Sequence, residues 1–228
     1  MAGAKQKVSA ARLLIVLSRF LAAAALALGA GTAGAQNLER LEPSAAHPTI
    51  GYYIAPGEAG SQFRPGDVDL ARWALGAWQR ALGGALELTP APESEALLRV
   101  HFIAADAADA GQYGEMRAIR VDGQRGAEVF IRPDTDALGP EIASRARVDA
   151  LFRDTIVYLT CLHELGHALG LRHTASFDDV MYFFGFGGDI PEFFGRYRRA
   201  LESRNDIAKV SGLSAGDLAH LHDLYRRK

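Results

Sequence analysis

The stretch that most constrains the fold of this chain covers residues 160–174 and reads TCLHELGHALGLRHT. On an α-helix, residues four positions apart are separated by about 40° around the axis, so His163 and His167 present their imidazoles on one face. Gly170 follows, and a residue without a Cβ readily takes the left-handed conformation that ends a helix. The chain can then turn sharply and bring His173 back toward the same point.

Three converging imidazoles predict a metal site. Three nitrogen ligands leave the fourth tetrahedral position open, as in catalytic zinc sites. Glu164 directly follows the first histidine, and in an H-E-x-x-H pattern this carboxylate takes the proton of a zinc-activated water. The motif therefore predicts one catalytic Zn²⁺ bound by His163, His167 and His173, with Glu164 as general base. H-E-x-x-H alone could be a helix with two exposed histidines, but the complete pattern makes that interpretation weak.

A methionine stands eight positions after the third histidine. It is Met181, in the sequence DDVMY, and Tyr182 follows it directly. By this pattern the chain resembles the metzincin zinc endopeptidases, in which a methionine turn lies beneath the metal. It is most similar to the matrixins, because of HELGHALGL, the interval to Met181 and the tyrosine after it. Phe183 stands where some related families have a metal-approaching tyrosine, so no such ligand is expected, and Met181 is expected as a hydrophobic floor.

The resemblance implies an α/β fold of the α+β, zincin-like type. Its expected parts are a mixed, twisted sheet with an antiparallel edge strand, a long active-site helix, a methionine turn and a C-terminal helix. Hydrophobic periodicity agrees with this order. It predicts strands at 49–54, 86–89, 97–103, 115–121 and 127–132, and helices at 67–82, 148–171 and 213–225.

The first 35 residues have the features of an export signal. They contain four basic residues and no acidic one, then an apolar run over 20–28 and the cleavage motif AGA at 33–35. This arrangement is typical of a secretory signal peptide, with cleavage before Gln36. We expect residues 1–35 to be this signal, 36–48 a short linker and 49–228 the zinc metalloprotease domain, in the periplasm or secreted. An uncleaved anchor is the alternative.

Charge and cysteine content restrict the possible partners. Removing residues 1–35 removes four positive charges and changes the net charge from −2 to −6, which argues against a nucleic-acid surface. The only cysteine is Cys161, so the chain has neither an intrachain disulfide nor a propeptide cysteine that could block the metal. Cys161 lies about 200° around the helix from His163 and is expected to be a buried hydrophobic residue. We expect a monomer without membrane contact once the signal is removed.

The segment 104–114 is predicted to be a loop. In matrixins the corresponding loop binds a structural zinc through histidines, and calcium through carboxylates and carbonyls. This loop contains no histidine, so the structural zinc is expected to be missing. Asp106 and Asp109 make a calcium ion possible, but two carboxylates support it only weakly.

Two further segments bear on the substrate. The resemblance places strand 115–121 at the sheet edge above the cleft, where an extended protein or peptide would add as another strand; a plain surface hairpin is the alternative. The segment 183–197 contains five phenylalanines and a tyrosine. It either lines a pocket that prefers a hydrophobic residue just after the scissile bond, or forms a hydrophobic cluster that packs an extra helix around 193–203.

The expected function is therefore that of a zinc-dependent endopeptidase. Two alternatives remain open. One is a non-peptidase zinc hydrolase that acts on another amide or on an ester. The other is a catalytically silent module that binds zinc or peptide, against which Glu164 argues, because such a module needs no base.

Overall fold

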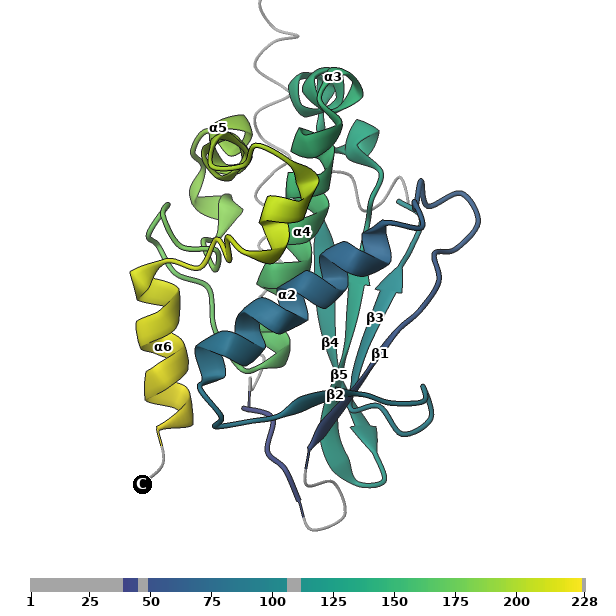
Figure 1. The fold of residues 1–228 in the computed structure, drawn as a ribbon, viewed down its shortest axis with the longest axis vertical. Helices are drawn as coiled ribbons and strands as arrows, with labels where there is room; N and C mark the ends of the chain where they lie inside the picture. Colours follow the sequence, from purple (N-terminus) through teal and green to yellow (C-terminus); the bar gives the residue numbers. More distant parts are fainter. Residues whose placement is uncertain (1–38, 45–48, 106–111, 227–228) are drawn as a thin grey trace, which may run out of the picture. The chain divides into compact units, whose positions relative to one another are not determined.

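Five strands form one mixed sheet (Figure 1). The computed structural model describes residues 39–44, 49–105 and 112–226. The strands are β1 (Ile50–Ile54), β2 (Leu88–Pro90), β3 (Leu98–Phe102), β4 (Gly114–Val121) and β5 (Gln124–Ile131). They are ordered β2-β1-β3-β5-β4, and β4, at one edge, is the one that runs antiparallel to its neighbour. The predicted mixed sheet with an antiparallel edge strand is confirmed.

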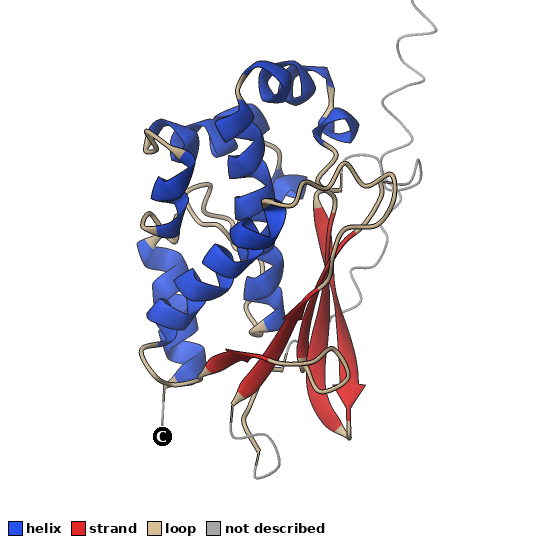
Figure 2. Cartoon of the chain, turned by 45° about the vertical axis from the view of Figure 1, so that its right-hand side comes forward, coloured by secondary structure: helices blue, strands red, loops and turns tan. Residues whose placement is uncertain are grey.

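Helices cover one face of this sheet, as Figure 2 shows. They are α2 (Asp67–Leu82), α3 (Pro140–Val148), α4 (Ala150–Ala168), α5 (Ile190–Arg199) and α6 (Ala215–Tyr225). Short 3₁₀ segments occupy 135–138, 184–186 and 204–208. The central helix α4 contacts α2, β4 and β5. The predicted α/β class, with its long active-site helix and its C-terminal helix, is confirmed.

The predicted single helix over 148–171 is wrong at both ends. The backbone is extended at Asp149, which separates α3 from α4, and α4 ends at Ala168. The Asp149 carboxylate caps α4 by accepting a hydrogen bond from the Phe152 amide at 3.0 Å. It also accepts one from Arg198 Nε of α5 at 2.9 Å. A helix cap and a distant ion pair therefore interrupt an apolar pattern that continues through this point.

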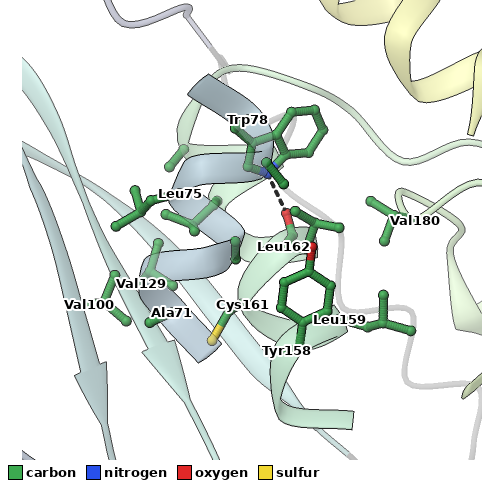
Figure 3. Packing of buried hydrophobic residues seen from close by; sticks show 14 of the residues in the cluster. Ala71, Leu75, Trp78, Val100, Val129, Tyr158, Leu159, Cys161, Leu162 and Val180 are labelled. Atoms are coloured by element: carbon green, nitrogen blue, oxygen red, sulfur yellow. Dashed lines mark hydrogen bonds between the residues drawn. The ribbon is translucent and has the colours of Figure 1, made fainter. Parts of the chain in front are cut away.

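The core lies between the sheet and α2 and α4 (Figure 3). Trp78 of α2 is fully buried, and its indole Nε1 donates a hydrogen bond to the Leu162 carbonyl of α4 at 2.9 Å. This bond fixes α4 one residue before His163. Cys161 is also fully buried, which confirms its prediction as a core residue, and burial raises the pKa of its thiol.

A buried ion pair joins the start of α2 to α4. Asp67 is the first residue of α2, and its carboxylate pairs with Arg153. Both side chains are buried, and the Arg153 guanidinium also donates to the Gln62 carbonyl at 3.2 Å. Removing one partner of a buried pair leaves the other charge without compensation, so this contact bears strongly on stability.

Replacing Asp67 with alanine is expected to lower the free energy of unfolding by about 3–5 kcal/mol, because the Arg153 guanidinium stays buried without its main carboxylate. Urea unfolding measures the loss. Asp69→Ala is the matched control, since Asp69 lies in the same helical turn and pairs with Arg72 at the surface. That change is expected to cost less than about 1 kcal/mol. Equal losses of stability in both variants would contradict the conclusion that the buried Asp67–Arg153 pair is the stabilising contact.

Residues 39–44 are part of the domain, so the prediction of a linker is wrong for this segment. Leu41 is 0% exposed and belongs to the core. Arg40 Nη1 donates to the Leu224 carbonyl of α6 at 2.9 Å, and Gln124 Nε2 donates to the Glu42 carbonyl at 2.6 Å. The segment is thus attached to both the C-terminal helix and the β4–β5 hairpin.

Several predictions fall outside the described residues. They are the export signal at 1–35, the rest of the predicted linker at 36–38 and 45–48, and the acidic pair Asp106 and Asp109. In the ranges that are described, no helix combines the length and the apolar character needed to cross a membrane.

Candidate metal centre

The three predicted histidines converge on one point. His163 Nε2 lies 3.2 Å from His167 Nε2 and 3.3 Å from His173 Nε2, and the last two are 3.1 Å apart. Within the described ranges, this is the group of three or more His, Cys, Asp or Glu side chains close enough to share a metal ion. Tetrahedral zinc with ordinary Zn–N bonds needs nitrogens about 3.3 Å apart. The spacing of the three nitrogens therefore fits zinc.

Hydrogen bonds fix the tautomers of the two helical histidines. His163 Nδ1 lies 2.7 Å from the Val180 carbonyl, and His167 Nδ1 lies 2.8 Å from the Leu171 carbonyl. A carbonyl only accepts, so each Nδ1 carries the proton and each Nε2 presents its lone pair to the centre of the cluster. Metal-binding histidines are usually oriented in this way. The Nε2 lone pairs of His163 and His167 face each other at 3.2 Å and repel, and a cation between them would remove that repulsion.

Burial keeps these imidazoles neutral. Burial first, and then the neighbouring imidazoles, lower the pKa of His163 to about 3 and that of His167 to about 4. Burial also lowers the pKa of His173, which is more exposed. Neutral imidazoles are the form that binds a metal, so the cluster is ready to bind one at neutral pH.

Glu164 is buried beside the first histidine, with 7% of its surface exposed. Burial first, and then the nearby Glu115, raise its pKa to about 8 against the opposing effect of Arg132. The surroundings alone therefore favour the protonated carboxyl. A cation in the adjacent histidine cluster would favour the carboxylate instead, because an opposite charge nearby stabilises the ionised form.

The metal-free protein is expected to be most stable near pH 6.5. Below that pH, His163 and His167 bind protons in the unfolded chain but not in the folded one, so stability falls as pH drops toward 4. Above it, Glu164 keeps its proton only in the folded protein, so stability falls as pH rises toward 8. Each decline should be on the order of 1–2 kcal/mol.

Urea unfolding of chelator-treated protein between pH 4.5 and 8.5 tests this profile. The Glu164→Gln variant has no titrating carboxyl at this position, so it should lose the alkaline decline and keep the acidic one. A stability that stays constant between pH 4.5 and 6.5 would contradict the depressed pKa values of the two histidines.

The methionine turn packs against α4 between the two helical histidines. Met181 is buried, and a Cβ on Gly166 would lie 2.4 Å from its Sδ atom, so only glycine at 166 allows this approach. The fully buried Asp217 carboxylate of α6 accepts hydrogen bonds from the amides of Val180 at 2.8 Å and Met181 at 3.2 Å. The C-terminal helix thus holds the turn whose Val180 carbonyl orients His163.

Asp217 is a positioning residue that the sequence only partly revealed. Ser214 and Asp217 have the spacing of a capping box, and the structure contains that reciprocal cap. Its contact with the methionine turn joins residues 36 and 37 positions apart in the chain. The sequence carries no local signal of that contact.

A cavity of about 200 Å³ opens beside the histidine cluster. His163, Glu164 and His173 lie in its wall. Aromatic rings from three segments supply more than half of the remainder: Tyr113, Tyr182, Phe183, Phe184, Phe193 and Phe194. Neighbouring rings are in contact, with centroids 5.0 Å apart for Phe184 and Phe193 and 5.4 Å apart for Tyr113 and Phe184.

Both interpretations of the aromatic segment describe part of what is found. An extra helix does exist, as α5 over Ile190–Arg199 and not around 193–203. Phe193 and Phe194 are among the buried residues that pack this helix, and the same two rings line the cavity. The cluster that attaches α5 is therefore also a wall of the pocket.

The edge strand begins directly against the buried carboxylate. A Cβ on Gly114 would lie 2.8 Å from Glu164 Cγ and 2.9 Å from Thr160 Cγ2, so glycine lets β4 and α4 approach closely here. Along the strand, Arg117, Ala118 and Arg120 are exposed. An exposed edge that starts at the cavity is the geometry that strand addition by an extended peptide requires.

Comparison with known proteins agrees with this geometry. Residues 50–186 match the model of the matrixin peptidase family. The matched region contains the whole sheet, α4, the three histidines and the methionine turn, whereas α5 and α6 lie beyond it. A search of curated proteins found no match.

Proposed function

Because the chain belongs to the matrixin family of zinc-dependent peptidases, we propose that it is an endopeptidase that cleaves extended protein or peptide segments. One observation carries this proposal. Three imidazole Nε2 atoms converge beside a buried glutamate at the mouth of an aromatic cavity. Members of the family are mostly secreted or extracellular. We place this chain in the periplasm or outside the cell, as a monomer that binds neither nucleic acid nor membrane.

His163, His167 and His173 would hold the zinc ion. When bound, zinc supplies Lewis acidity, which polarises the scissile carbonyl and makes water a stronger acid. The Glu164 carboxylate takes a proton from the attacking water and delivers it to the nitrogen of the leaving amine. Its burial keeps bulk solvent from competing for that proton. Val180 and Leu171 hold the imidazole rings in the required orientation through their carbonyls.

The substrate pairs with the exposed edge of β4 and runs past the histidine cluster. Backbone hydrogen bonds along such an edge provide affinity without regard to sequence, and side-chain pockets provide selectivity. The side chain just after the scissile bond enters the cavity beside Glu164. Because aromatic rings line that cavity, it favours an apolar side chain, and it would leave a charged one without a partner.

The test combines metal analysis with a peptide library. We expect about one zinc per chain and cleavage before large apolar residues. Preference for charged residues after the scissile bond would overturn the pocket assignment. Hydrolysis of simple amides or esters without peptide cleavage would identify a non-peptidase zinc hydrolase. Zinc binding without any hydrolysis would identify a silent binding module.

A further inference from the structure

Two exposed aromatic side chains stand beside the histidine cluster. Among the residues that the structure describes, the exposed large hydrophobic side chains are Val148, Phe183 and Phe186. Phe183 is 41% exposed and Phe186 is 64% exposed, and their rings meet edge to face with centroids 5.2 Å apart. We call this pair the aromatic shelf. Val148 lies elsewhere, at the end of α3.

The aromatic shelf is held in place by its backbone. The Phe186 amide donates to the Phe183 carbonyl at 3.0 Å, and the Tyr182 hydroxyl donates to the Gly187 carbonyl at 3.0 Å. The Phe183 amide donates to the Thr174 carbonyl at 3.2 Å, which attaches the turn to the strand-like segment after His173. The two rings are therefore presented to solvent by a fixed turn, and a preorganised surface loses little conformational entropy on binding.

The shelf is continuous with the proposed substrate site. Phe183 is part of the cavity wall, and its ring centroid lies 4.8 Å from that of His173. The Phe186 ring packs edge to face against the Phe183 ring and is not part of the cavity wall. Consecutive residues of an extended peptide advance about 3.3 Å, so a neighbour of the residue in the cavity reaches the shelf.

We propose that the aromatic shelf is a second binding site for the same substrate. It takes an apolar side chain, best an aromatic one, within two positions of the residue that enters the cavity. This inference rests on the proposed function. It narrows the substrate class to segments with two bulky apolar residues close together, which folded proteins usually bury. Unfolded or locally opened proteins are thus the preferred substrates.

Peptide binding to the zinc-loaded Glu164→Ala protein tests the shelf without catalysis. Each peptide has leucine for the cavity and either phenylalanine or alanine at the neighbouring positions. Fluorescence anisotropy measures the Kd of each peptide for the Glu164→Ala protein and for the same protein that also carries Phe186→Ala. We expect this change to weaken binding of the phenylalanine peptide about tenfold and to leave the alanine peptide unchanged. Phe186→Tyr should retain the preference, because the ring remains.

Val148→Ala is the matched control, since it also removes an exposed hydrophobic side chain, and it should change neither Kd. The proposal of a second binding site is contradicted if Phe186→Ala changes the Kd of both peptides equally or of neither. With Glu164 intact, kcat/KM should follow the same pattern. If the intact protein cleaves no peptide while the Kd difference persists, the proposed function fails and the shelf remains a peptide-binding site.

Discussion

Replacing Glu164 with alanine is expected to reduce kcat for peptide hydrolysis by at least about 10³-fold while leaving about one zinc per chain. The reason is that its carboxylate is placed to move a proton and is not among the three converging nitrogens. Initial rates on a library-derived peptide give the loss in kcat, and elemental analysis of the same sample gives its zinc content.

Two further variants separate the basicity of Glu164 from its size. Glu164→Gln keeps the shape but cannot accept the proton, so it should lose as much activity as the alanine variant. Glu164→Asp keeps a carboxylate but moves it back, so it should retain part of the rate. If the glutamine variant kept more than about a tenth of the activity, another group would have to be the base.

The raised pKa of Glu164 connects its role to the metal. With a pKa of about 8 in the metal-free protein, much of this residue is protonated at neutral pH and cannot act as a base. A divalent cation at the histidines would lower that pKa, since opposite charges stabilise each other strongly where solvent is excluded. The same ion that makes water more acidic thus also prepares the residue that takes its proton.

The parts of the site that the sequence revealed are those that depend on local spacing. His163 and His167 share a helical face because they are four residues apart, and Gly170 does adopt a positive φ of 100° before the turn to His173. The strand pattern likewise predicted the sheet, since alternating or continuous apolar runs report which side of a strand is buried.

The parts that the sequence did not reveal depend on distant partners. Leu41 looks like an isolated leucine in a polar segment, and its burial requires the C-terminal helix that Arg40 contacts 184 positions away. Asp149 interrupts an apolar helical pattern because α5 supplies Arg198 to its carboxylate. Asp217 caps its own helix, but its bonds to the amides of Val180 and Met181 depend on the distant methionine turn. In each case the deciding interaction joins segments whose proximity no local pattern encodes.

His173→Ala is expected to abolish zinc binding and peptide hydrolysis while leaving the fold intact. Of the three histidines, His173 is the exposed one, so its loss creates no large cavity in the core. The two remaining imidazoles cannot complete a three-nitrogen site. Zinc affinity should therefore fall by more than about 100-fold, beyond the effect typical of removing a residue that only orients a ligand.

Thermal unfolding with and without added zinc provides a readout independent of activity. A ligand at about 1,000 times its Kd stabilises the folded state by about 4 kcal/mol, so zinc should raise the Tm of the unmodified protein by several degrees. It should not raise that of the His173→Ala variant. His222→Ala is the control, because His222 is an exposed histidine of α6 that contacts the Ala81 carbonyl, and its zinc response should be unchanged. If His173→Ala kept the full zinc-dependent rise in Tm, the three converging nitrogens would not be the zinc ligands. The reaction assigned to Glu164 would then have no zinc ion beside it.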